Sequence, residues 1–196
     1  MFTGIIEAVG TVKSRETNGT NVTFQIESAI SQELKVDQSI SHNGVCLTVE
    51  NIAGSTHQVT AIAETLSVTN LEAWQPGTLV NLERCMILNG RIDGHIVQGH
   101  VDGIGTCAAV VEKNGSTEFT FAFDESFAPL VIEKGSICLN GISLTVFNVT
   151  ATTFTVAIIP YTIDHTNMRQ LKTGDKVNLE FDVIGKYISR NANLKM

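Results

Sequence analysis

The sequence predicts an all-β protein of two tandem six-stranded antiparallel barrels, related by internal duplication and followed by a short C-terminal α-helix. Three observations lead to this prediction. Blocks of sequence repeat at a fixed spacing, apolar residues alternate with period two in both copies, and the last residues change to helical spacing. The length of 196 residues is enough for one large domain or two small ones.

The repeat is clearest in one block of eleven residues. Residues 39–49 (SISHNGVCLTV) align with residues 136–146 (SICLNGISLTV) with seven identities, at an offset of 97. The same offset carries Thr69-Asn70 onto Thr166-Asn167, and residues 80–83 (VNLE) onto residues 177–180. We therefore assign residues 1–97 to a first barrel and residues 98–182, with a repeat that extends to about residue 194, to a second.

Each copy has the pattern of short strands. Val22, Phe24 and Ile26 alternate with polar residues, and at the same offset of 97 the phenylalanines 119, 121 and 123 alternate in the second copy. Further strands are expected in residues 39–51, 58–63 and 78–83, separated by Gly, Asn and Pro, and short helical turns in residues 29–34 and 126–132. About six short strands in under 100 residues favour a closed barrel, because closure removes unpaired strand edges.

The tail differs from the strands before it. Val183, Ile184, Tyr187 and Ile188 have helical spacing and form one apolar stripe, which predicts a helix in residues 183–196. A helix this short is marginal in water by itself, so the stripe is expected to pack on other subunits or, as the alternative, on its own barrel.

Composition excludes several classes of protein. The net charge of −7 argues against a nucleic-acid partner, and the sequence has no apolar run long enough to span a membrane. The first residues do not have the pattern of a secretion signal, so a cytoplasmic location is expected. The four cysteines form no Cys-x-x-Cys pair and the five histidines lack zinc-ligand spacing, so we expect reduced thiols and no metal.

Several motifs together resemble the riboflavin synthase family over essentially the whole chain. They are residues 1–5 (MFTGI), 43–49 (NGVCLTV), 64–66 (ETL), 69–71 (TNL), 80–84 (VNLER), 94–103 (GHIVQGHVDG) and 140–146 (NGISLTV). One departure is Asp93, where the family usually has a second glycine. The resemblance implies Greek-key barrels, each of which binds one lumazine.

The resemblance also implies an activity and an assembly. The family joins two molecules of 6,7-dimethyl-8-ribityllumazine: one gives up a four-carbon unit and becomes 5-amino-6-(ribitylamino)uracil, and the other becomes riboflavin. It works without a cofactor as a homotrimer whose C-terminal helices meet at the axis, and association with lumazine synthase is a further hypothesis. The active site is expected where the first barrel of one subunit faces the second barrel of its neighbour. A duplicated module fits a reaction between two identical molecules, because holding both rings together can lower the barrier by roughly 7–11 kcal/mol.

The resemblance also assigns substrate-binding residues. Cys46 and Thr48, like Ser143 and Thr145, lie two apart on a predicted strand, so both polar groups of each pair share one face. In the first barrel the expected contacts are Gly4, Ile5, Ile6, Cys46, Leu47, Thr48, Thr60, Ala61, Ile62, Ala63, Glu64 and Thr65. In the second they are His100, Val101, Asp102, Lys134, Ser143, Leu144, Thr145, Ile158, Ile159, Pro160, Tyr161, Thr162 and Ile163.

The reaction requires a base that removes a proton from the lumazine C7 methyl group. His100 is the best candidate for this base because imidazole titrates near neutral pH, and Cys46 is the best candidate for a nucleophile or polar partner. The remaining catalytic candidates are Ser39, Phe2, Ser143 and Asp182, of which Asp182 can also cap the predicted helix. Taken alone, a histidine in a glycine-rich turn is more often a loop hydrogen-bonder, and Cys46 would be a small buried residue; we interpret His95 as structural.

The two copies differ where donor and acceptor must differ. Cys46 aligns with Ser143, His42 with Leu139 and Asp37 with Lys134. Two alternative functions remain open at this point: a non-catalytic lumazine- or flavin-binding antenna protein, and a structural β-barrel repeat protein. Retention of the Cys46-Leu47-Thr48 block and of the segment around His100 favours the enzyme.

Overall fold

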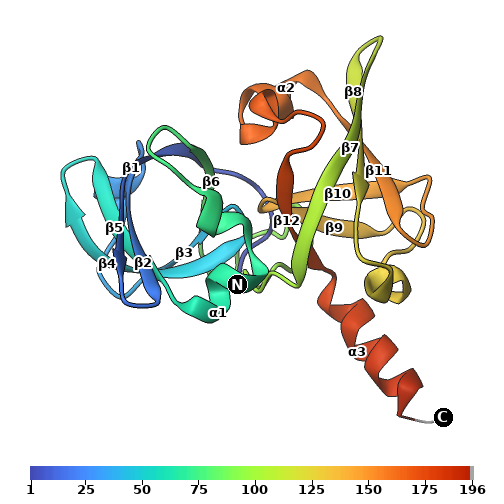
Figure 1. The fold of residues 1–196 in the computed structure, drawn as a ribbon, viewed down its shortest axis with the longest axis horizontal. Helices are drawn as coiled ribbons and strands as arrows, with labels where there is room; N and C mark the ends of the chain where they lie inside the picture. Colours follow the sequence, from blue (N-terminus) through green and yellow to red (C-terminus); the bar gives the residue numbers. More distant parts are fainter. Residues whose placement is uncertain (195–196) are drawn as a thin grey trace.

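The computed structural model describes residues 1–194 and contains two closed barrels that lie side by side (Figure 1). The first has the strand order β1-β2-β5-β4-β3-β6, and the second β10-β11-β8-β7-β12-β9, which is the same ring. Pairing of β2 with β5 and of β3 with β6 skips intervening strands, as in a Greek key. The predicted two-barrel fold is confirmed.

The twelve strands have these bounds: β1 (Ala8–Asn18), β2 (Asn21–Glu27), β3 (Ser39–His42), β4 (Val45–Ala53), β5 (Thr56–Ala61), β6 (Leu79–Arg84), β7 (Gly103–Lys113), β8 (Ser116–Ala122), β9 (Ser136–Leu139), β10 (Ile142–Phe147), β11 (Thr153–Ile158) and β12 (Lys176–Phe181). Residues 85–102 connect the barrels, so the expected boundary at residue 97 lies inside this connection. The expected strand over residues 39–51 is two strands, because Asn43 and Gly44 have φ values of 48° and 81° and form a tight turn.

Short helices connect the strands. The expected helical turns are present as the 3₁₀ helices η1 (Ser31–Glu33) and η3 (Glu125–Leu130). Four further helices were not predicted from the sequence. They are α1 (Ala63–Val68) and α2 (Pro160–Asp164), which follow the strands β5 and β11, and the 3₁₀ helices η2 (Asn70–Ala73) and η4 (Asn167–Gln170) after them. These elements have five or six residues at most, so they show no helical periodicity in the sequence.

The offset between the copies is 97 residues only from β3 onward. In the first barrel Val12 pairs with Ile26 and the bulge follows Val12; in the second Cys107 pairs with Phe121 and the bulge follows Cys107. These partners lie 95 residues apart, so the alignment of Ile26 with Phe123 was wrong. The second copy has two additional residues in the connection between β8 and β9. The alternation of apolar residues in β8 cannot reveal them, because it repeats every two residues.

The first barrel encloses a chain of hydrogen-bonded side chains. Ser28 Oγ lies 2.9 Å from Ser31 Oγ, which lies 2.8 Å from His57 Nδ1; His57 Nε2 lies 2.9 Å from His42 Nε2. His42 Nδ1 lies 3.1 Å from the Ile40 carbonyl oxygen, an acceptor, so this nitrogen carries the hydrogen. Each remaining bond then has one direction: His57 donates to His42, Ser31 to His57, and Ser28 to Ser31. These directions apply while both imidazoles are neutral.

The second barrel has an aromatic interior instead. The ring of Phe154 lies 5.6 Å from that of Phe121 and 5.7 Å from that of Phe123, and Phe127 lies 4.9 Å from Phe181. All these separations are in the range of favourable aromatic pairs. The two cores are therefore chemically unlike within the same fold.

Asparagine side chains join the two barrels around an approximate twofold axis. Asn81 Nδ2 donates to the carbonyl of Asn140 at 2.9 Å, and Asn178 Nδ2 donates to the carbonyl of Asn43 at 2.9 Å. A Cβ atom on Gly44 would lie 2.9 Å from the backbone nitrogen of Gly141, so the two turns meet closely. The repeated asparagines therefore fix how the barrels sit against each other.

The C-terminal helix α3 (Val183–Asn193) projects away from the second barrel (Figure 1). Asp182 caps it, because its Oδ1 accepts a hydrogen bond from the Ile184 backbone nitrogen at 2.9 Å. Ile184, Tyr187 and Ile188 are 59 %, 70 % and 65 % exposed, so most of the predicted apolar stripe is uncovered in the single chain. No helix within residues 1–194 is both long and apolar enough to cross a bilayer.

Candidate functional site: two related pockets

The segments that precede the two barrels are exchanged between them. Phe2 and Val97 form a small antiparallel bridge, with backbone N···O distances of 2.7 and 3.1 Å. Beyond this bridge, the Gly4 carbonyl accepts a hydrogen bond from the Ser143 nitrogen of the second barrel at 2.8 Å. The Gly99 carbonyl accepts one from the Cys46 nitrogen of the first barrel at 2.9 Å. Each segment thus extends the barrel to which it does not belong.

Two pockets form where these segments cross. The first, of about 230 Å³, lies over β4 and α1 of the first barrel; its walls are Val45, Cys46, Glu64, Thr65, Val68, Thr69, Gly99, His100 and Val101. The second, of about 180 Å³, lies over β10 and α2 of the second barrel; its walls are Gly4, Ile5, Ile6, Ile142, Ser143, Leu144, Tyr161, Thr162, His165 and Thr166. We call them the Cys46 pocket and the Ser143 pocket.

The assignment of the exchanged segments to barrels was wrong in the sequence analysis. Gly4, Ile5 and Ile6 were expected in the first barrel, and they line the pocket of the second. His100 and Val101 were expected in the second barrel, and they line the pocket of the first. A position in the sequence before a barrel does not reveal the exchange, because the bridge between Phe2 and Val97 is a contact over 95 residues.

The pockets are matched in position and different in chemistry. Cys46 corresponds to Ser143, Thr65 to Thr162 and Thr69 to Thr166 at an offset of 97. In contrast, Glu64 corresponds to Tyr161 and Val68 to His165. His100, held by the exchanged segment, corresponds to Ile5 at the offset of 95. One pocket therefore has a thiol, a carboxylate and an imidazole from the exchanged segment. The other has a hydroxyl, a phenol and the imidazole of His165, which directly follows α2.

The thiol of Cys46 is half-buried above an apolar cluster of Phe2, Val97 and Cys138. Burial raises the pKa of Cys46, although the neighbouring Ser39 hydroxyl lowers it. The thiol is therefore protonated near neutral pH, which favours its role as a polar partner over that of a ready nucleophile. Phe2 is fully buried, so its side chain supports the floor of the pocket.

His95 holds the Ser143 hydroxyl, a contact that the sequence analysis missed. His95 Nδ1 lies 2.7 Å from Ser143 Oγ, and the imidazole is 9 % exposed. Burial lowers the pKa of His95, while the nearby charge of Asp182 raises it. Asp182 therefore acts on this pair in addition to capping α3. The interpretation of His95 as merely structural did not anticipate a direct contact with a candidate site residue.

Several other expected binding residues do not line either pocket. Leu47, Ala61 and Ile158 point into the barrel cores because strand residues alternate between faces. Thr60 bonds Thr23 and Glu50 on the outside of the first barrel. The remaining expected residues outside the two sets of pocket walls are Thr48, Ile62, Ala63, Asp102, Lys134, Thr145, Ile159, Pro160 and Ile163. Of these, Asp102 binds the Phe181 nitrogen at 2.9 Å and Lys186 Nζ at 2.6 Å.

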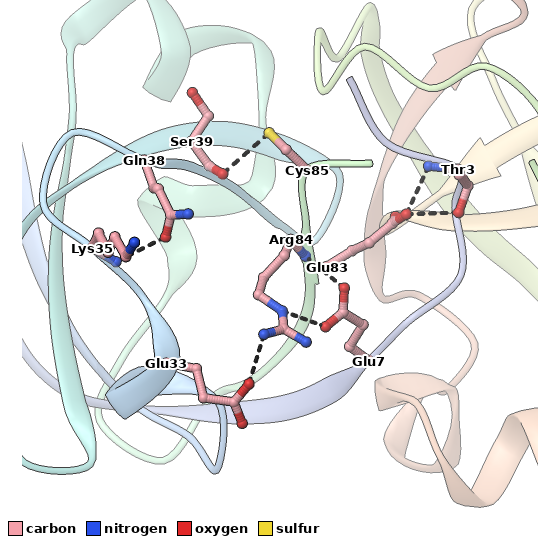
Figure 2. A network of polar contacts seen from close by, with 9 residues as sticks. All are labelled: Thr3, Glu7, Glu33, Lys35, Gln38, Ser39, Glu83, Arg84 and Cys85. Carbon is pink, nitrogen blue, oxygen red and sulfur yellow. Dashed lines mark hydrogen bonds and ion pairs between the residues drawn. The ribbon is translucent and has the colours of Figure 1, made fainter. Parts of the chain in front are cut away.

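A larger cavity of about 610 Å³ lies between the first barrel and residues 85–93. Ser39 and Arg84 both line it. Arg84 is 2.6 Å from Glu7 and 2.7 Å from Glu33, and Figure 2 shows these two ion pairs. The two smaller pockets, unlike this one, repeat in both barrels around the aligned Cys46 and Ser143. We therefore base the functional site on the matched pair.

Comparison with known proteins identifies the family. The profile described as Lumazine binding domain matches residues 3–85 and 98–182, one match for each barrel. The riboflavin synthase of Bacillus subtilis is 40% identical over 191 residues, which cover 97% of this chain and 89% of that protein. The enzyme of Actinobacillus pleuropneumoniae is 41% identical over the same shares, and that of Saccharomyces cerevisiae is 36% identical over 100% of this chain and 88% of the relative.

The chain belongs to the riboflavin synthase family. Members of this family are transferases of riboflavin biosynthesis, and the chain is an enzyme of this kind. Crystal structures of LumP with 6,7-dimethyl-8-(1'-D-ribityl) lumazine and with riboflavin have the same fold, with TM-scores of 0.84 and 0.86. They are 21% and 20% identical to this chain. The aligned residues make up 92% of this chain and 98% and 99% of the two LumP chains. Sequence similarity therefore favours riboflavin synthase over an antenna protein.

Proposed function

We propose that the chain makes riboflavin from two molecules of 6,7-dimethyl-8-ribityllumazine, with one molecule in the Cys46 pocket and one in the Ser143 pocket. The observation that carries this proposal is the pair of pockets at the same place in two copies, lined by unlike polar groups. The shared position of the two pockets in the repeated barrel explains why both bind the same ring system. Unlike polar groups explain how one molecule becomes the donor of the four-carbon unit and the other its acceptor.

The sizes of the pockets support a site that forms between subunits. Pockets for small molecules usually have about 300–1,000 Å³. The Cys46 pocket has about 230 Å³ and the Ser143 pocket about 180 Å³, so neither can hold two bicyclic rings face to face. The two pockets share no lining residue. We propose that the Cys46 pocket of one subunit meets the Ser143 pocket of its neighbour in a homotrimer, assembled through the exposed stripe of α3.

The roles of individual residues follow from this arrangement. His100 lines the Cys46 pocket and is exposed, so its imidazole can take a proton from the C7 methyl group of a bound lumazine and release it to water. The Cys46 thiol donates a hydrogen bond to the ring bound beside it. The Ser143 hydroxyl, held by His95, does the same in the other pocket. Loss of the proton leaves a carbanion that is stabilised by delocalisation into the ring.

Turnover is the direct test of the proposed function. Purified protein incubated with 6,7-dimethyl-8-ribityllumazine should produce the fluorescence of riboflavin and an equal amount of 5-amino-6-(ribitylamino)uracil. Cys46→Ala should slow turnover much more than it weakens binding. Binding of the lumazine without any new riboflavin would instead establish the antenna function, and failure to bind it would point to a structural protein.

Mixed subunits test the location of the site. A Cys46→Trp chain has a filled first pocket, and a Ser143→Trp chain a filled second pocket. After subunit exchange, an intact Cys46 pocket can meet an intact Ser143 pocket of another chain, so the mixture should recover activity that neither variant has alone. No recovery in a mixture shown by mass spectrometry to contain both chains would place both pockets of one site within a single chain. Deletion of residues 187–196 should lower the oligomeric state measured by light scattering.

A further inference from the structure

Two buried carboxylates fix the exchanged segments. Glu83 on β6 and Glu180 on β12 occupy the same place in the two copies, and they are 4 % and 2 % exposed. Glu83 accepts hydrogen bonds from the Thr3 nitrogen at 2.7 Å, the Thr3 hydroxyl at 2.8 Å and the Gly4 nitrogen at 2.9 Å. Figure 2 shows this carboxylate reaching from the first barrel to Thr3. Glu83 therefore holds the N-terminal segment by its backbone.

Glu180 holds the connecting segment in the same way. Its Oε1 accepts a hydrogen bond from the Gln98 nitrogen at 2.6 Å, and its Oε2 accepts from the nitrogens of Gly99 and His100, both at 2.9 Å. Hydrogen bonds to a charged acceptor are stronger than neutral ones, and here three converge on one buried group. The backbone of His100 is thus tied to the second barrel while its side chain lines the pocket of the first.

We propose that Glu83 and Glu180 are positioning residues whose effects are crossed between the barrels. Glu180, a residue of the second barrel, sets the Cys46 pocket by placing Gly99 and His100. Glu83, a residue of the first barrel, sets the Ser143 pocket by placing Gly4 and Ile5. The meaning of the two pockets rests on the proposed function, but the crossed placement is a property of the fold.

The glycines show how little freedom these segments have. A Cβ atom on Gly99 would lie 2.6 Å from the Cβ of Cys46, and one on Gly4 would lie 2.6 Å from the Cβ of Ser143. Both glycines also have positive φ values, of 82° and 79°. Each segment is therefore pressed onto one barrel on one side and bound by a carboxylate of the other barrel on its opposite side. Loss of the carboxylate releases the segment from the pocket that it covers.

The reactivity of Cys46 tests this proposal without use of activity. Iodoacetamide labelling followed by peptide mass spectrometry reports Cys46 separately from the other thiols. In the full-length protein, Glu180→Gln places an amide N–H against the backbone donors, so the segment detaches and Cys46 should label about tenfold faster. The matched Glu83→Gln variant should change the rate at Cys46 much less, by about twofold at most, because Phe2 under Cys46 remains paired with Val97 when Thr3 and Gly4 are released.

A reporter in the other pocket completes the cross. In a Ser143→Cys background the new thiol should label faster with Glu83→Gln and not with Glu180→Gln. Cys107, fully buried in the second barrel, is the control for global opening, and its rate should not change in any variant. Glu180→Asp retains the charge on a shorter side chain and should restore part of the protection of Cys46. An effect that came only from lost packing would not be reversed by this shorter side chain.

Three results would overturn the proposal. They are an equal acceleration of Cys46 labelling in both variants, an acceleration in Glu83→Gln alone, and no acceleration in either variant. Should a Gln variant fail to fold, Gly99→Ala and Gly4→Ala displace the same two segments from the pocket side and must give the same crossed pattern. Because labelling needs no substrate, the crossed pattern can hold in a protein that makes no riboflavin, and riboflavin formation can persist where the pattern fails.

Discussion

The two barrels share one strand order, but the interior of the first contains hydrogen-bonded polar side chains and that of the second is aromatic. Where the first barrel has His42 and His57, the second has Leu139 and Phe154. The first barrel satisfies its buried imidazoles with a directed chain that ends at the Ile40 carbonyl. The second fills the same space with phenylalanines whose rings pack at a tilt against Phe154. A barrel of this size therefore accepts either solution, provided that every buried polar atom has a partner.

The difference has a consequence for stability. Burial and the neighbouring His57 lower the pKa of His42 well below its usual range, and burial lowers that of His57 to about 4. Protons on both imidazoles would place two N–H groups against each other between the rings. We expect the first barrel to be sensitive to acid in a way that the second is not.

Removal of Phe154 should have the largest effect on stability. Phe154→Ala deletes the ring at the centre of the aromatic interior, and substitutions of this kind cost about 3–5 kcal/mol. Urea unfolding followed by circular dichroism measures this loss. Phe147→Ala, which removes a half-buried ring under Lys134, is the control and should cost much less. Equal costs for the two would mean that the second barrel does not depend on its aromatic core.

Acid should destabilise the first barrel next most strongly. The unfolded chain binds a proton on His57 near pH 6.5 and the folded chain near pH 4, so the free energy of unfolding decreases as pH falls through this interval. The shift corresponds to a loss of about 3 kcal/mol from His57. The double change His42→Leu with His57→Phe installs the residues of the second barrel. A pH dependence between 6.5 and 4 that is unaltered in this variant would rule out the histidines as its origin.

Interruption of the hydrogen-bonded chain should have a smaller effect. Ser31→Ala removes the donor to His57 Nδ1 and leaves this buried nitrogen unpaired, which costs about 1–3 kcal/mol. The offset of 95 that holds through β8 places Ser126 at the corresponding position in the second copy, so Ser126→Ala, which removes an exposed hydroxyl, serves as the matched control. Thermal unfolding of both variants near pH 7 makes the comparison, and a loss smaller in Ser31→Ala than in the control would contradict it.

The cap of α3 should have the smallest effect. Only the second barrel continues into a helix; the first continues into the connection over residues 85–102. Asp182→Ala removes the capping acceptor, and such changes cost about 1 kcal/mol. Hydrogen exchange at residues 183–186 should accelerate, while exchange in β6 stays constant as the internal control. Unchanged exchange at the start of α3 would show that the cap does not hold the helix.

Sequence patterns predicted the elements that depend on local periodicity. Duplication, strand alternation and the apolar stripe from Val183 gave the two barrels and the final helix. The missed α1 shows the limit, because its six residues are fewer than two turns of the helical pattern. The alignment of β2 with β8 was wrong because Phe119, Phe121 and Phe123 alternate equally well at two offsets.

The structure brings several of the expected binding residues to the two pockets, but the contacts of these residues were not predicted. Cys46, Thr65, Ser143 and Thr162 line the pockets, and their binding of a ligand stays a prediction. The contact of His95 with Ser143 spans 48 residues, and the exchange of the two leading segments spans still more. Such contacts arise from tertiary packing and leave no period in the sequence. The repeat of Glu83 at Glu180 was the available signal, and it indicated a shared role without revealing which backbone each carboxylate binds.

The number of ligands bound by one chain tests the central claim most directly. Riboflavin, a product that does not react further, can be titrated calorimetrically into the intact protein. Two binding events per chain are expected, reduced to one by Cys46→Trp and, independently, to one by Ser143→Trp. A single site per chain in the unaltered protein, lost entirely on filling one pocket and unaffected by filling the other, would contradict the account.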